Sequence, residues 1–558
     1  MSSGNPIVEC VPNFSNGRDK RVIEAISQAI REVPGAALLD VDPGEATNRT
    51  VFTMVGAPDA VIEAAFQAIK KGQELIDMRS HHGAHPRMGA CDVCPFVPVA
   101  DITMEQCAEL ARRLGARVGQ ELGIPVYLYE HAASKPEWKN LAVVRQGEYE
   151  GLEARSSDDY WKPDFGPVFN ARSGATAVGA RPFLVAYNIN LNTREVRKAQ
   201  KISAILREKG IARRDENNVA IRDAAGELVR DPGMFRCVKG MGWFIDEYDC
   251  AQMTFNMTDY TVSSPHELLD AARRLADQEG VVITGSELVG LIPLDAMLQA
   301  GHYYLKRQGV CQGAPWNEVI ECAIRSMGLR DLSEFDPDHS IIERQIQKDG
   351  PLVSMTVREW ADTLSSQAPA PGGGSVAALC GSMAAGLAAM VGNLTVGKKG
   401  YEDKWELLDE PAVKAQALKE AFLADIDNDT AAFDSVMVAF GLPKGTPTEK
   451  QARGAAIRRA NQHATMVPLG VLERCVATLP CIEAALQGNE NARSDAGVAV
   501  LMCKACAEGA WYNVCINTKS MKDREFVTMV RERADAALAT VDEAAARLTK
   551  LVREQLGG

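Results

Sequence analysis

The segment Ser80–Val99 gathers several side chains that can do chemistry. Three of the eight histidines of this 558-residue chain, His81, His82 and His85, lie here beside Arg87, and an apolar strand pattern follows directly. A histidine with an ordinary pKa of about 6.5 can take up and return a proton near neutral pH. The segment therefore predicts a reactive loop at the edge of a rigid sheet, where catalytic groups are commonly held.

Two other uses of these histidines stay open. His81 and His85 are four residues apart, a spacing that on a helix could bind zinc. Gly83 and Pro86 argue against that helix, because a proline pushes the residue before it into an extended conformation. A histidine cluster with a purely structural role is the second alternative.

Length, charge and cysteine content narrow the class of protein. A chain of 558 residues predicts roughly three or four domains. The net charge of −13 argues against a nucleic-acid partner, because binding to phosphates requires a basic face. The start of the chain lacks a basic segment followed by an apolar run, so we expect no signal peptide. Fourteen cysteines then indicate free thiols in a reducing compartment, which predicts a cytoplasmic protein.

Two sequence patterns could be mistaken for a membrane span and for metal sites. Val376–Val391 is almost entirely apolar but shorter than the ~20 residues that a membrane span needs, so we expect a buried helix and no membrane span. The pairs Cys91/Cys94 and Cys503/Cys506 have Cys-x-x-Cys spacing, but neither has a second pair at zinc-ribbon spacing. We expect thiols in the core and no bound metal.

The order of elements predicts a multidomain chain. Its first part reads β-α-β-β-α-β, which resembles a ferredoxin-like split unit with extra elements. We expect an α/β lobe over 1–181, a second α/β lobe over 182–332, a charged linker over 333–351 and an all-helical bundle over 352–558.

Two stretches at the end of the first lobe are less regular. Gly151–Gly166 shows no periodicity and predicts a loop, and Phe169–Arg181 is rich in small residues and arginine without a clear element.

Three motifs resemble a known family. HPRMGACDVCPF resembles the signature loop of glutamate formiminotransferase, and ECVPNFSNGRD at Glu9–Asp19 resembles its N-terminal strand and turn. APGGGSVA at Ala370–Ala377 resembles the opening of formiminotetrahydrofolate cyclodeaminase. Together they resemble the bifunctional formimidoyltransferase–cyclodeaminase family of histidine breakdown.

The resemblance implies two reactions. A formimino group passes from N-formimino-L-glutamate to N5 of tetrahydrofolate, and the product then cyclises to 5,10-methenyltetrahydrofolate with loss of ammonia. It implies tetrahydrofolate, with its polyglutamate tail, as co-substrate, no tightly bound cofactor, and a homo-oligomer.

The resemblance also assigns residues in the first reaction. His85 matches the catalytic histidine, and Asp42 and Arg87 match polar residues around the transferred group, with His81 and His82 as supporting residues. Asp42 could instead only form the turn before Pro43, and Arg87 could be a salt-bridge residue.

Folate contacts are implied in two stretches. Gly166, Phe169, Arg172, Ser173, Gly174 and Ala175 form one, and Met234, Phe235, Arg236 and Lys239 form the other. Arg172, Arg236 and Lys239 are the candidates for the anionic tail. Substrate would lie in a cleft between the two lobes. The alternative is a glycine-rich hinge.

In the last third, Gly372, Gly373, Gly374 and Ser375 precede a helix pattern, and a helix start with bare N–H groups binds anions. We expect Ser375 to cap that helix. Asp427 and Asp429 are two residues apart and should face different ways on their helix. By resemblance, Asp429 is the acid–base residue of the second reaction and the glycine-rich start contacts folate. The alternative is a solvated acidic turn.

We therefore expect a bifunctional folate enzyme. The alternatives are a chain in which only one site is active, and a folate-binding or scaffold protein without turnover.

Overall fold

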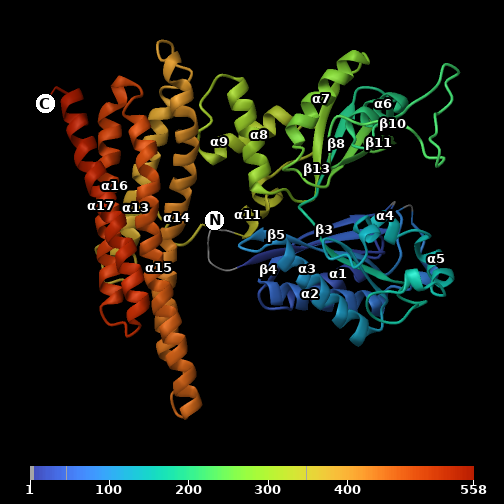
Figure 1. Ribbon diagram of the computed structural model, residues 1–558, viewed down its shortest axis with the longest axis horizontal. Coiled ribbons are helices and arrows are strands. Elements are labelled where there is room, and N and C mark those ends of the chain that lie inside the picture. The colour runs from blue at the N-terminus through green and yellow to red at the C-terminus, as the bar shows by residue number, and fades with distance from the viewer. Residues whose placement is uncertain (1–5, 46, 84, 347–348, 558) are drawn as a thin grey trace. The chain divides into compact units, whose positions relative to one another are not determined.

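The computed structural model describes residues 6–45, 47–83, 85–346 and 349–557. The chain folds into two compact units (Figure 1). The α/β unit consists of Met1–Ala296 with Met327–Gln345, and the helical unit of Met297–Ser326 with Ile346–Gly558.

The first lobe of the α/β unit is built on a mixed seven-stranded sheet. Its strands are β1 (Ile7–Cys10), β2 (Asn13–Phe14), β3 (Ala36–Gly44), β4 (Arg49–Gly56), β5 (Cys91–Ala100), β6 (Val126–Glu130) and β7 (Thr176–Ala180). Their order is β3, β4, β1 with β2, β5, β7 and β6; β7 is parallel to both its neighbours, and the other pairs are antiparallel.

Three helices cover one face of this sheet. They are α1 (Lys20–Arg31), α2 (Pro58–Leu75) and α3 (Met104–Arg117). Alternate strand residues such as Val8, Phe52 and Phe96 are fully buried in the core that these helices share with the sheet. Because side chains alternate along a strand, the residues between them point to the opposite face.

The opposite face is divided between an apolar and a polar region. At β6 and β7 it is covered by α4 (Leu141–Val144) and α5 (Glu148–Arg155), through a second cluster centred on Trp138. The face of β3 and β1 instead carries the carboxylates Asp40, Asp42 and Glu9, with Glu9 opposite Val55 of β4 and Val97 of β5. We call this region the polar face.

The end of the first lobe differs from the sequence expectation. Residues 148–155 form α5, where part of this stretch was expected to be a loop, and Phe169–Arg181 contains β7, in the interior of the sheet. Strand β7 (TAVGA) is built of small residues because Gly179 packs directly against the ring and carbonyl of Tyr129.

The second lobe contains a four-stranded antiparallel sheet. Its strands are β8 (Val185–Leu191), β11 (Val238–Ile245), β12 (Cys250–Met257) and β13 (Ile283–Val289), and its helices are α6 (Val196–Leu206) and α7 (Pro265–Gln278). A separate ribbon pairs β9 (Ile211–Ala212) with β10 (Arg230–Asp231).

The two lobes share a strand order. In the second lobe it is β11, β12, β8, β13, and the first lobe contains the equivalent series β3, β4, β1, β5. In each series the first strand in sequence lies between the third and the fourth. Sequence identities alone did not establish this correspondence.

The region between the second lobe and the bundle is helical. It contains α8 (Leu294–Arg307), α9 (Trp316–Met327), α10 (Pro337–Ser340) and α11 (Ile342–Ile346). Residues 297–326 pack in the helical unit: the Gly313 carbonyl accepts hydrogen bonds from Asn393 (2.8 Å) and Gln416 (2.9 Å). Residues 347 and 348 of the expected linker lie outside the described residues.

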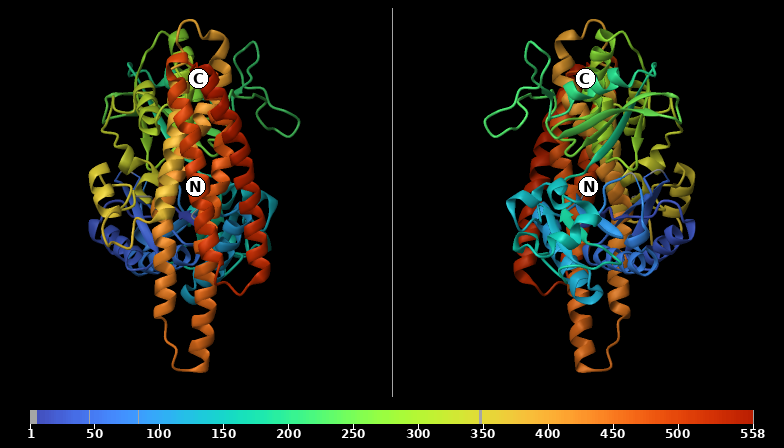
Figure 2. Two further views of the ribbon diagram at one scale, coloured as in Figure 1. Left: turned by 90° about the vertical axis from the view of Figure 1, so that its left-hand side faces the viewer. Right: turned by 90° about the vertical axis from the view of Figure 1, so that its right-hand side faces the viewer.

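The rest of the helical unit is a bundle, as expected. Its helices are α12 (Val357–Leu364), α13 (Gly373–Asn393), α14 (Trp405–Gly441), α15 (Pro447–Ala485), α16 (Arg493–Thr518) and α17 (Arg524–Gln555). The hairpin of α14 and α15 extends beyond the other helices (Figures 1 and 2).

Helix α13 lies at the centre of the bundle and packs closely on α14. A Cβ added at Gly381 would lie 2.5 Å from the Phe422 ring, and one at Gly392 would lie 2.7 Å from Ala412. The Ala/Gly-rich composition of α13 thus reflects helix packing. Helices α13 and α15 are long and apolar enough to cross a membrane, but 61% and 56% of their most apolar windows are buried inside the protein.

The cysteines of both Cys-x-x-Cys pairs are buried free thiols. Cys94 lies 3.4 Å from Cys10, and Cys506 lies 3.2 Å from Cys475, measured between sulfur atoms. Among the described residues, no group of three or more His, Cys, Asp or Glu side chains could hold a metal ion.

Candidate active sites

The histidine loop connects the short helix η1 (Met78–Ser80) to β5, and its described residues are not helical. His81 and His85 consequently do not share a helix face, as Gly83 and Pro86 predict. The two imidazoles have different surroundings, which determine what each can do.

One ring nitrogen of His85 has no hydrogen-bond partner among the described residues. Its Nδ1 lies 2.7 Å from the Pro86 carbonyl oxygen, an acceptor, so Nδ1 carries the hydrogen and Nε2 carries the lone pair. Partial burial, and then the positive charges of Arg49 and Arg145, lower the pKa of His85 to about 4. The ring is therefore neutral near pH 7, with Nε2 able to accept a proton.

His81 is held in the opposite tautomer. Its Nε2 lies 3.0 Å from the Asn48 carbonyl and must donate, while its Nδ1 accepts from Nε of Arg87 at 3.3 Å. Both nitrogens are occupied, so His81 supports the loop and His85 is the better base.

Arg87 is buried and holds the histidine loop in place through ion pairs and hydrogen bonds. Its guanidinium forms ion pairs with Glu148 (3.2 Å) and Glu150 (2.7 Å), and it also donates to the His81 carbonyl at 3.2 Å. These contacts join the loop to α5. The salt-bridge role that the sequence left open is therefore present, and any effect of Arg87 on the substrate passes through the loop it holds.

A buried charged cluster is hydrogen-bonded to the histidine loop at Met88, and the sequence motifs did not single it out. Asp92 of β5 accepts a hydrogen bond from Nη1 of Arg49 at 2.6 Å and one from Nη2 of Arg145. The Met88 N–H donates to its other oxygen at 3.0 Å, and Nε of Arg49 donates to Asn13 at 3.0 Å. Although burial opposes ionisation, the two arginines keep the pKa of Asp92 below its ordinary value. The cluster thus combines two positive charges and one negative charge.

The carboxylates of the polar face form a second group. Asp42 is exposed to solvent, but the surrounding protein partly desolvates its carboxyl group and so raises the pKa. The pKa of Asp40 is raised by burial and then by the charge of Asp42. Glu9 is fully buried, burial raises its pKa to about 8, and its Oε2 has no hydrogen-bond partner within the described residues.

The first predicted folate stretch supports the histidine loop. Gly174 has φ +66°, and a Cβ there would lie 2.2 Å from the Met88 carbonyl, so the position requires glycine. Backbone hydrogen bonds run from Ala175 to Met88 and from Ala90 to Ser173. The loop conformation therefore depends on this stretch.

The other members of this stretch lie around it. Gly166 also has a positive φ, of +84°, and Phe169 packs against the Trp138 cluster. Arg172 donates to the Gln73 and Glu74 carbonyls at the end of α2. An arginine proposed for the folate tail thus acts as a helix cap here.

The second predicted folate stretch lies in the second lobe. The N–H groups of Met234 and Phe235 donate to carbonyls at the end of α6, and the side chains of Arg236 and Lys239 are exposed. The charge of Lys239 acts on Glu130 of β6 in the first lobe, where burial raises the carboxyl pKa and Lys239 lowers it.

In the helical unit, Asp429 lies at the start of α13. Its Oδ1 would be 2.2 Å from a Cβ at Gly374, so the carboxylate rests directly on that glycine. Burial raises its pKa, although the Ser375 amide opposes the shift. Asp427 faces elsewhere and accepts hydrogen bonds from the N–H groups of Leu352 (2.9 Å) and Val353 (3.2 Å). The different orientations of the two aspartates follow the sequence prediction.

Ser375 does not cap α13, in contrast to the expectation. The helix begins at Gly373 with Gly372 as its N-cap, so Ser375 is inside the first turn. Its hydroxyl donates to the Ile426 carbonyl of α14 at 2.9 Å. The serine therefore ties the start of α13 to the helix that carries Asp429.

A further ion pair lies one turn from Asp429. Nε of Arg474 on α15 donates to Asp425 at 2.8 Å, and the negative charge of Asp425 helps to raise the pKa of Asp429. Asn513 of α16 approaches Gly373. Side chains of α14 and α16 thus approach the glycine-rich start of α13, and Arg474 of α15 pairs with the neighbouring Asp425.

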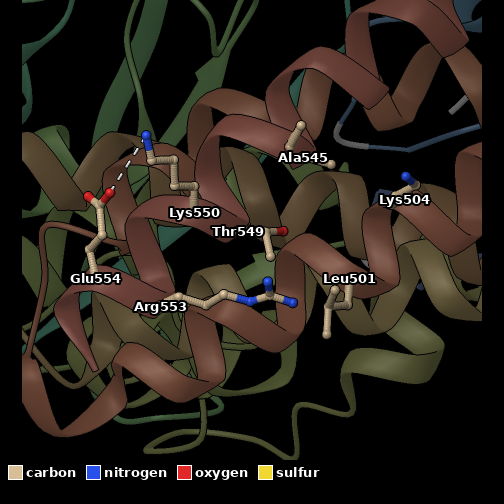
Figure 3. Close-up of a pocket in the computed structure, with 8 residues that line it drawn as sticks. Leu501, Lys504, Ala545, Thr549, Lys550, Arg553 and Glu554 are labelled. Carbon is tan, nitrogen blue, oxygen red and sulfur yellow. Dashed lines mark ion pairs between the residues drawn. The ribbon is translucent and has the colours of Figure 1, made fainter. Parts of the chain in front are cut away.

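A groove of about 550 Å³ lies elsewhere on the helical unit, between α16 and α17 (Figure 3). Lys504, Lys550 and Arg553 line it, but Lys504 pairs with Asp542 and Lys550 with Glu554. None of the predicted site residues lines this groove.

The geometry offers two candidate acid–base sites, one in the α/β unit around His85 and one in the helical unit around Asp429. Family models match at three places. The formiminotransferase N-terminal subdomain matches residues 7–181, the formiminotransferase domain matches 186–347, and formiminotransferase-cyclodeaminase matches 356–536.

Curated relatives agree over the whole chain. A formimidoyltransferase-cyclodeaminase of Dictyostelium discoideum is 40% identical over 98% of this chain and 99% of its own length. A glutamate formimidoyltransferase of Streptococcus pyogenes is 40% identical over 54% of this chain and 93% of its own. A methenyltetrahydrofolate cyclohydrolase of Methylorubrum extorquens is 40% identical over 36% of this chain and 97% of its own. The chain belongs to the formimidoyltransferase-cyclodeaminase family.

The sequence motifs alone did not reveal Arg49, Asp92, Arg145 and Glu9 as site residues. Asp92 and Glu9 each interrupt an apolar strand, and a charge at such a position usually has a partner or stays neutral. That signal is present in the motifs and could have found both carboxylates. Arg145 follows a short helix and carries no comparable signal.

Proposed function

We propose that this protein is a bifunctional folate enzyme. It transfers the formimino group from N-formimino-L-glutamate to tetrahydrofolate, which gives L-glutamate and 5-formimidoyltetrahydrofolate. It then cyclodeaminates that intermediate to 5,10-methenyltetrahydrofolate and ammonia. The observation that carries the proposal is the agreement of all three family matches with the two acid–base sites.

In the transfer, N5 of tetrahydrofolate attacks the amidine carbon and a new C–N bond forms. Nε2 of His85 takes the proton that N5 loses. The same proton then goes to the glutamate nitrogen as its bond to the carbon breaks. We assign Asp42 to the amidinium, which a carboxylate can orient, and Arg87 to holding the loop.

In the second reaction, N10 attacks the formimino carbon to close the ring. Asp429 takes the N10 proton and returns one to the departing nitrogen, which leaves as ammonia. Its raised pKa suits a group that must both accept and donate a proton. Gly372, Gly373, Gly374 and Ser375 present the helix start to the folate.

We place the folate on the α/β unit, where it would lie along the polar face in a cleft between the two lobes. Lys239 and Arg236 are exposed cations for its tail. Tetrahydrofolate polyglutamate is a co-substrate, and neither reaction uses a tightly bound cofactor or metal.

The finer assignments are proposals of the same kind. The shared strand order supports ferredoxin-like lobes, and the family matches support lobe limits near residue 181. Exposed Phe433, Met437 and Val438 on α14 support a homo-oligomer. Free thiols and largely buried apolar helices support a cytoplasmic protein without a membrane span.

One observation favours a second candidate for the helical unit. Its similarity to a protein named methenyltetrahydrofolate cyclohydrolase raises the hydrolysis of 5,10-methenyltetrahydrofolate as an activity. Adding 5,10-methenyltetrahydrofolate alone separates the two candidate activities. With a cyclodeaminase that lacks cyclohydrolase activity, the absorbance of this compound decays only at the uncatalysed rate.

The test is a spectrophotometric assay with tetrahydrofolate and N-formimino-L-glutamate, in which ammonia is measured in parallel. Methenyltetrahydrofolate and ammonia should appear in equal amounts. A folate-binding or scaffold protein gives neither product, even from synthetic 5-formimidoyltetrahydrofolate, and that result would overturn the proposal.

A further inference from the structure

The cluster of Arg49, Asp92 and Arg145 has an unbalanced positive charge. The side chains of Arg49 and Asp92 are 8% and 0% exposed, and that of Arg145 is 16% exposed. A buried charge is costly unless it is paired and hydrogen-bonded. One aspartate cannot neutralise two guanidinium groups, so the cluster can accept a further anion.

The cluster also has unused hydrogen-bonding capacity. Nε of Arg145 is buried and has no hydrogen-bond partner among the described residues. Buried N–H groups in native proteins are normally satisfied by protein, water or a ligand. A planar guanidinium matches a carboxylate in both shape and charge.

The cluster is joined to the loop that carries His85, because Asp92 accepts a hydrogen bond from the Met88 N–H at 3.0 Å, three residues after the histidine. Arg49 of β4 and Arg145 after α4 both depress the ionisation of the ring, and Asp92 of β5 opposes them. An anion held by the cluster would therefore lie beside the loop that carries the proposed base, a suitable place for the amino-acid half of the formimino donor.

We propose that Arg49 and Arg145 form the subsite for a carboxylate of N-formimino-L-glutamate, with Asp92 holding the two guanidinium groups together. The inference rests on the proposed role of His85 in formimino transfer. It adds the residues that recognise the amino-acid part of the donor, which the family resemblance did not supply.

Occupation of this subsite has a consequence for the base. The groups that face His85 are Arg49, Arg145, Asp92 and the Pro86 carbonyl. A bound carboxylate offsets the surplus positive charge, so the pKa of His85 should rise when the donor or the product glutamate binds. The donor would thus make its own base stronger.

The tetrahydrofolate tail also ends in glutamyl carboxylates, so kinetics must separate the two sources. In Arg145→Gln the KM for formiminoglutamate should rise by roughly ten- to a hundredfold, the range for losing a hydrogen bond to a charged group. The KM for tetrahydrofolate should change little. Arg145→Lys keeps the charge and should recover part of the loss.

Two controls accompany these variants. Arg113→Gln removes an exposed arginine that pairs with Asp59 and should leave both KM values unchanged. An unchanged KM for tetrahydrofolate and an unchanged circular dichroism melt report whether the α/β unit stays folded, because cyclodeamination reports only on the helical unit.

A ligand series identifies the carboxylate. L-Glutamate, glutamine and isoglutamine are compared as competitive inhibitors against formiminoglutamate; glutamine lacks the γ-carboxylate and isoglutamine the α-carboxylate. One of the two amides lacks the carboxylate that the subsite recognises, and the wild type should bind that amide at least tenfold more weakly than glutamate. The ratio of the two inhibition constants should be smaller in Arg145→Gln.

Three outcomes contradict the subsite. In the first, Arg145→Gln raises only the KM for tetrahydrofolate. In the second, the ratios of inhibition constants for both amides are the same in Arg145→Gln as in the wild type. In the third, glutamate does not change the pKa of His85 in an NMR titration. Each can occur while the wild-type enzyme still transfers the formimino group, so failure of the subsite is distinct from failure of the proposed function.

Discussion

At the scale of single residues, hydrogen bonds assign different roles to two neighbouring histidines. Both nitrogens of His81 are occupied, by Asn48 and Arg87, whereas His85 uses only Nδ1 within its own loop. Partial burial, together with the positive charges of Arg49 and Arg145, keeps the His85 ring uncharged. If His85 is the base that we propose, its neutral ring can accept a proton before any substrate binds.

The protonation of His85 gives a direct prediction. Its pKa of about 4 means that the ring stays neutral as the pH falls from 7 to 5, where an ordinary histidine would become mostly charged. NMR of the ring nitrogens, assigned with His85→Gln, should show no titration in this range. A midpoint near 6.5 in the free enzyme would contradict the assigned environment.

Glu9 provides a second prediction. Its folded-state pKa of about 8 lies above the ordinary value of 4.5, so its contribution to stability is full below pH 4.5 and is lost as the pH rises through 8. Each pKa unit corresponds to about 1.4 kcal/mol. Glu9→Gln copies the neutral acid and cannot ionise.

The melting temperature of Glu9→Gln relative to wild type should therefore be higher at pH 8 than at pH 5. Measurements in matched buffers at the two pH values decide the point. An equal difference at both pH values would show that Glu9 is already ionised in the folded protein.

The resemblance of short motifs to the family predicted His85, Asp42 and Asp429 as candidates, because such motifs can be matched along a single sequence. The partners of those residues were less predictable. Arg145 reaches Asp92 from a position 53 residues away, and only the folded chain brings the two together.

At the scale of secondary-structure elements, the close approach of α13 and α14 builds the second candidate site. Asp429 rests on the backbone of Gly374, which a larger residue would not allow. The small residues of α13 therefore serve both the packing of the bundle and the position of the carboxylate.

A matched pair of glycine variants tests this arrangement. Gly374→Ala places a methyl group where the Asp429 carboxylate lies, and a displacement of about 1 Å at a catalytic group can cost about a hundredfold in rate. Cyclodeamination should fall by that order while formimino transfer is retained.

Gly386→Ala is the control in the same helix. A Cβ at Gly386 meets nothing within 4 Å, and alanine favours a helix over glycine by about 1 kcal/mol. This variant should keep both activities and melt slightly higher. Equal losses of cyclodeamination in the two variants would assign the effect to helix α13 as a whole.

The elements themselves were predictable where periodicity was strong, as in α1 and α17, whose apolar residues recur at helical spacing. Strand β7 was not, because five small residues show neither alternation nor bulk, and its partners β5 and β6 are distant in sequence. Helix α5 is short and has only one fully buried residue, Leu152, so its sequence shows little amphipathic pattern.

At the scale of the whole molecule, each unit has a core of its own. The first lobe packs around residues such as Phe14 and Phe96, and the helical unit around residues such as Ala389 and Phe422. The sequence predicted an α/β part and a helical part, but not that residues 297–326 pack with the bundle, because helix patterns do not reveal their packing partners.

Because His85 and Asp429 belong to different units, we expect that the two activities can be lost separately. His85→Asn and Asp429→Asn are the variants to compare, each assayed for formimino transfer and, with synthetic 5-formimidoyltetrahydrofolate, for cyclodeamination. Circular dichroism melts establish that both variants are folded.

Comparing these two variants tests most directly whether each unit carries one of the two reactions. His85→Asn should lose transfer and keep cyclodeamination, Asp429→Asn should do the reverse, and a mixture of the two should again convert formiminoglutamate and tetrahydrofolate to methenyltetrahydrofolate. A folded variant that loses both activities, or neither, would contradict the assignment of one reaction to each unit.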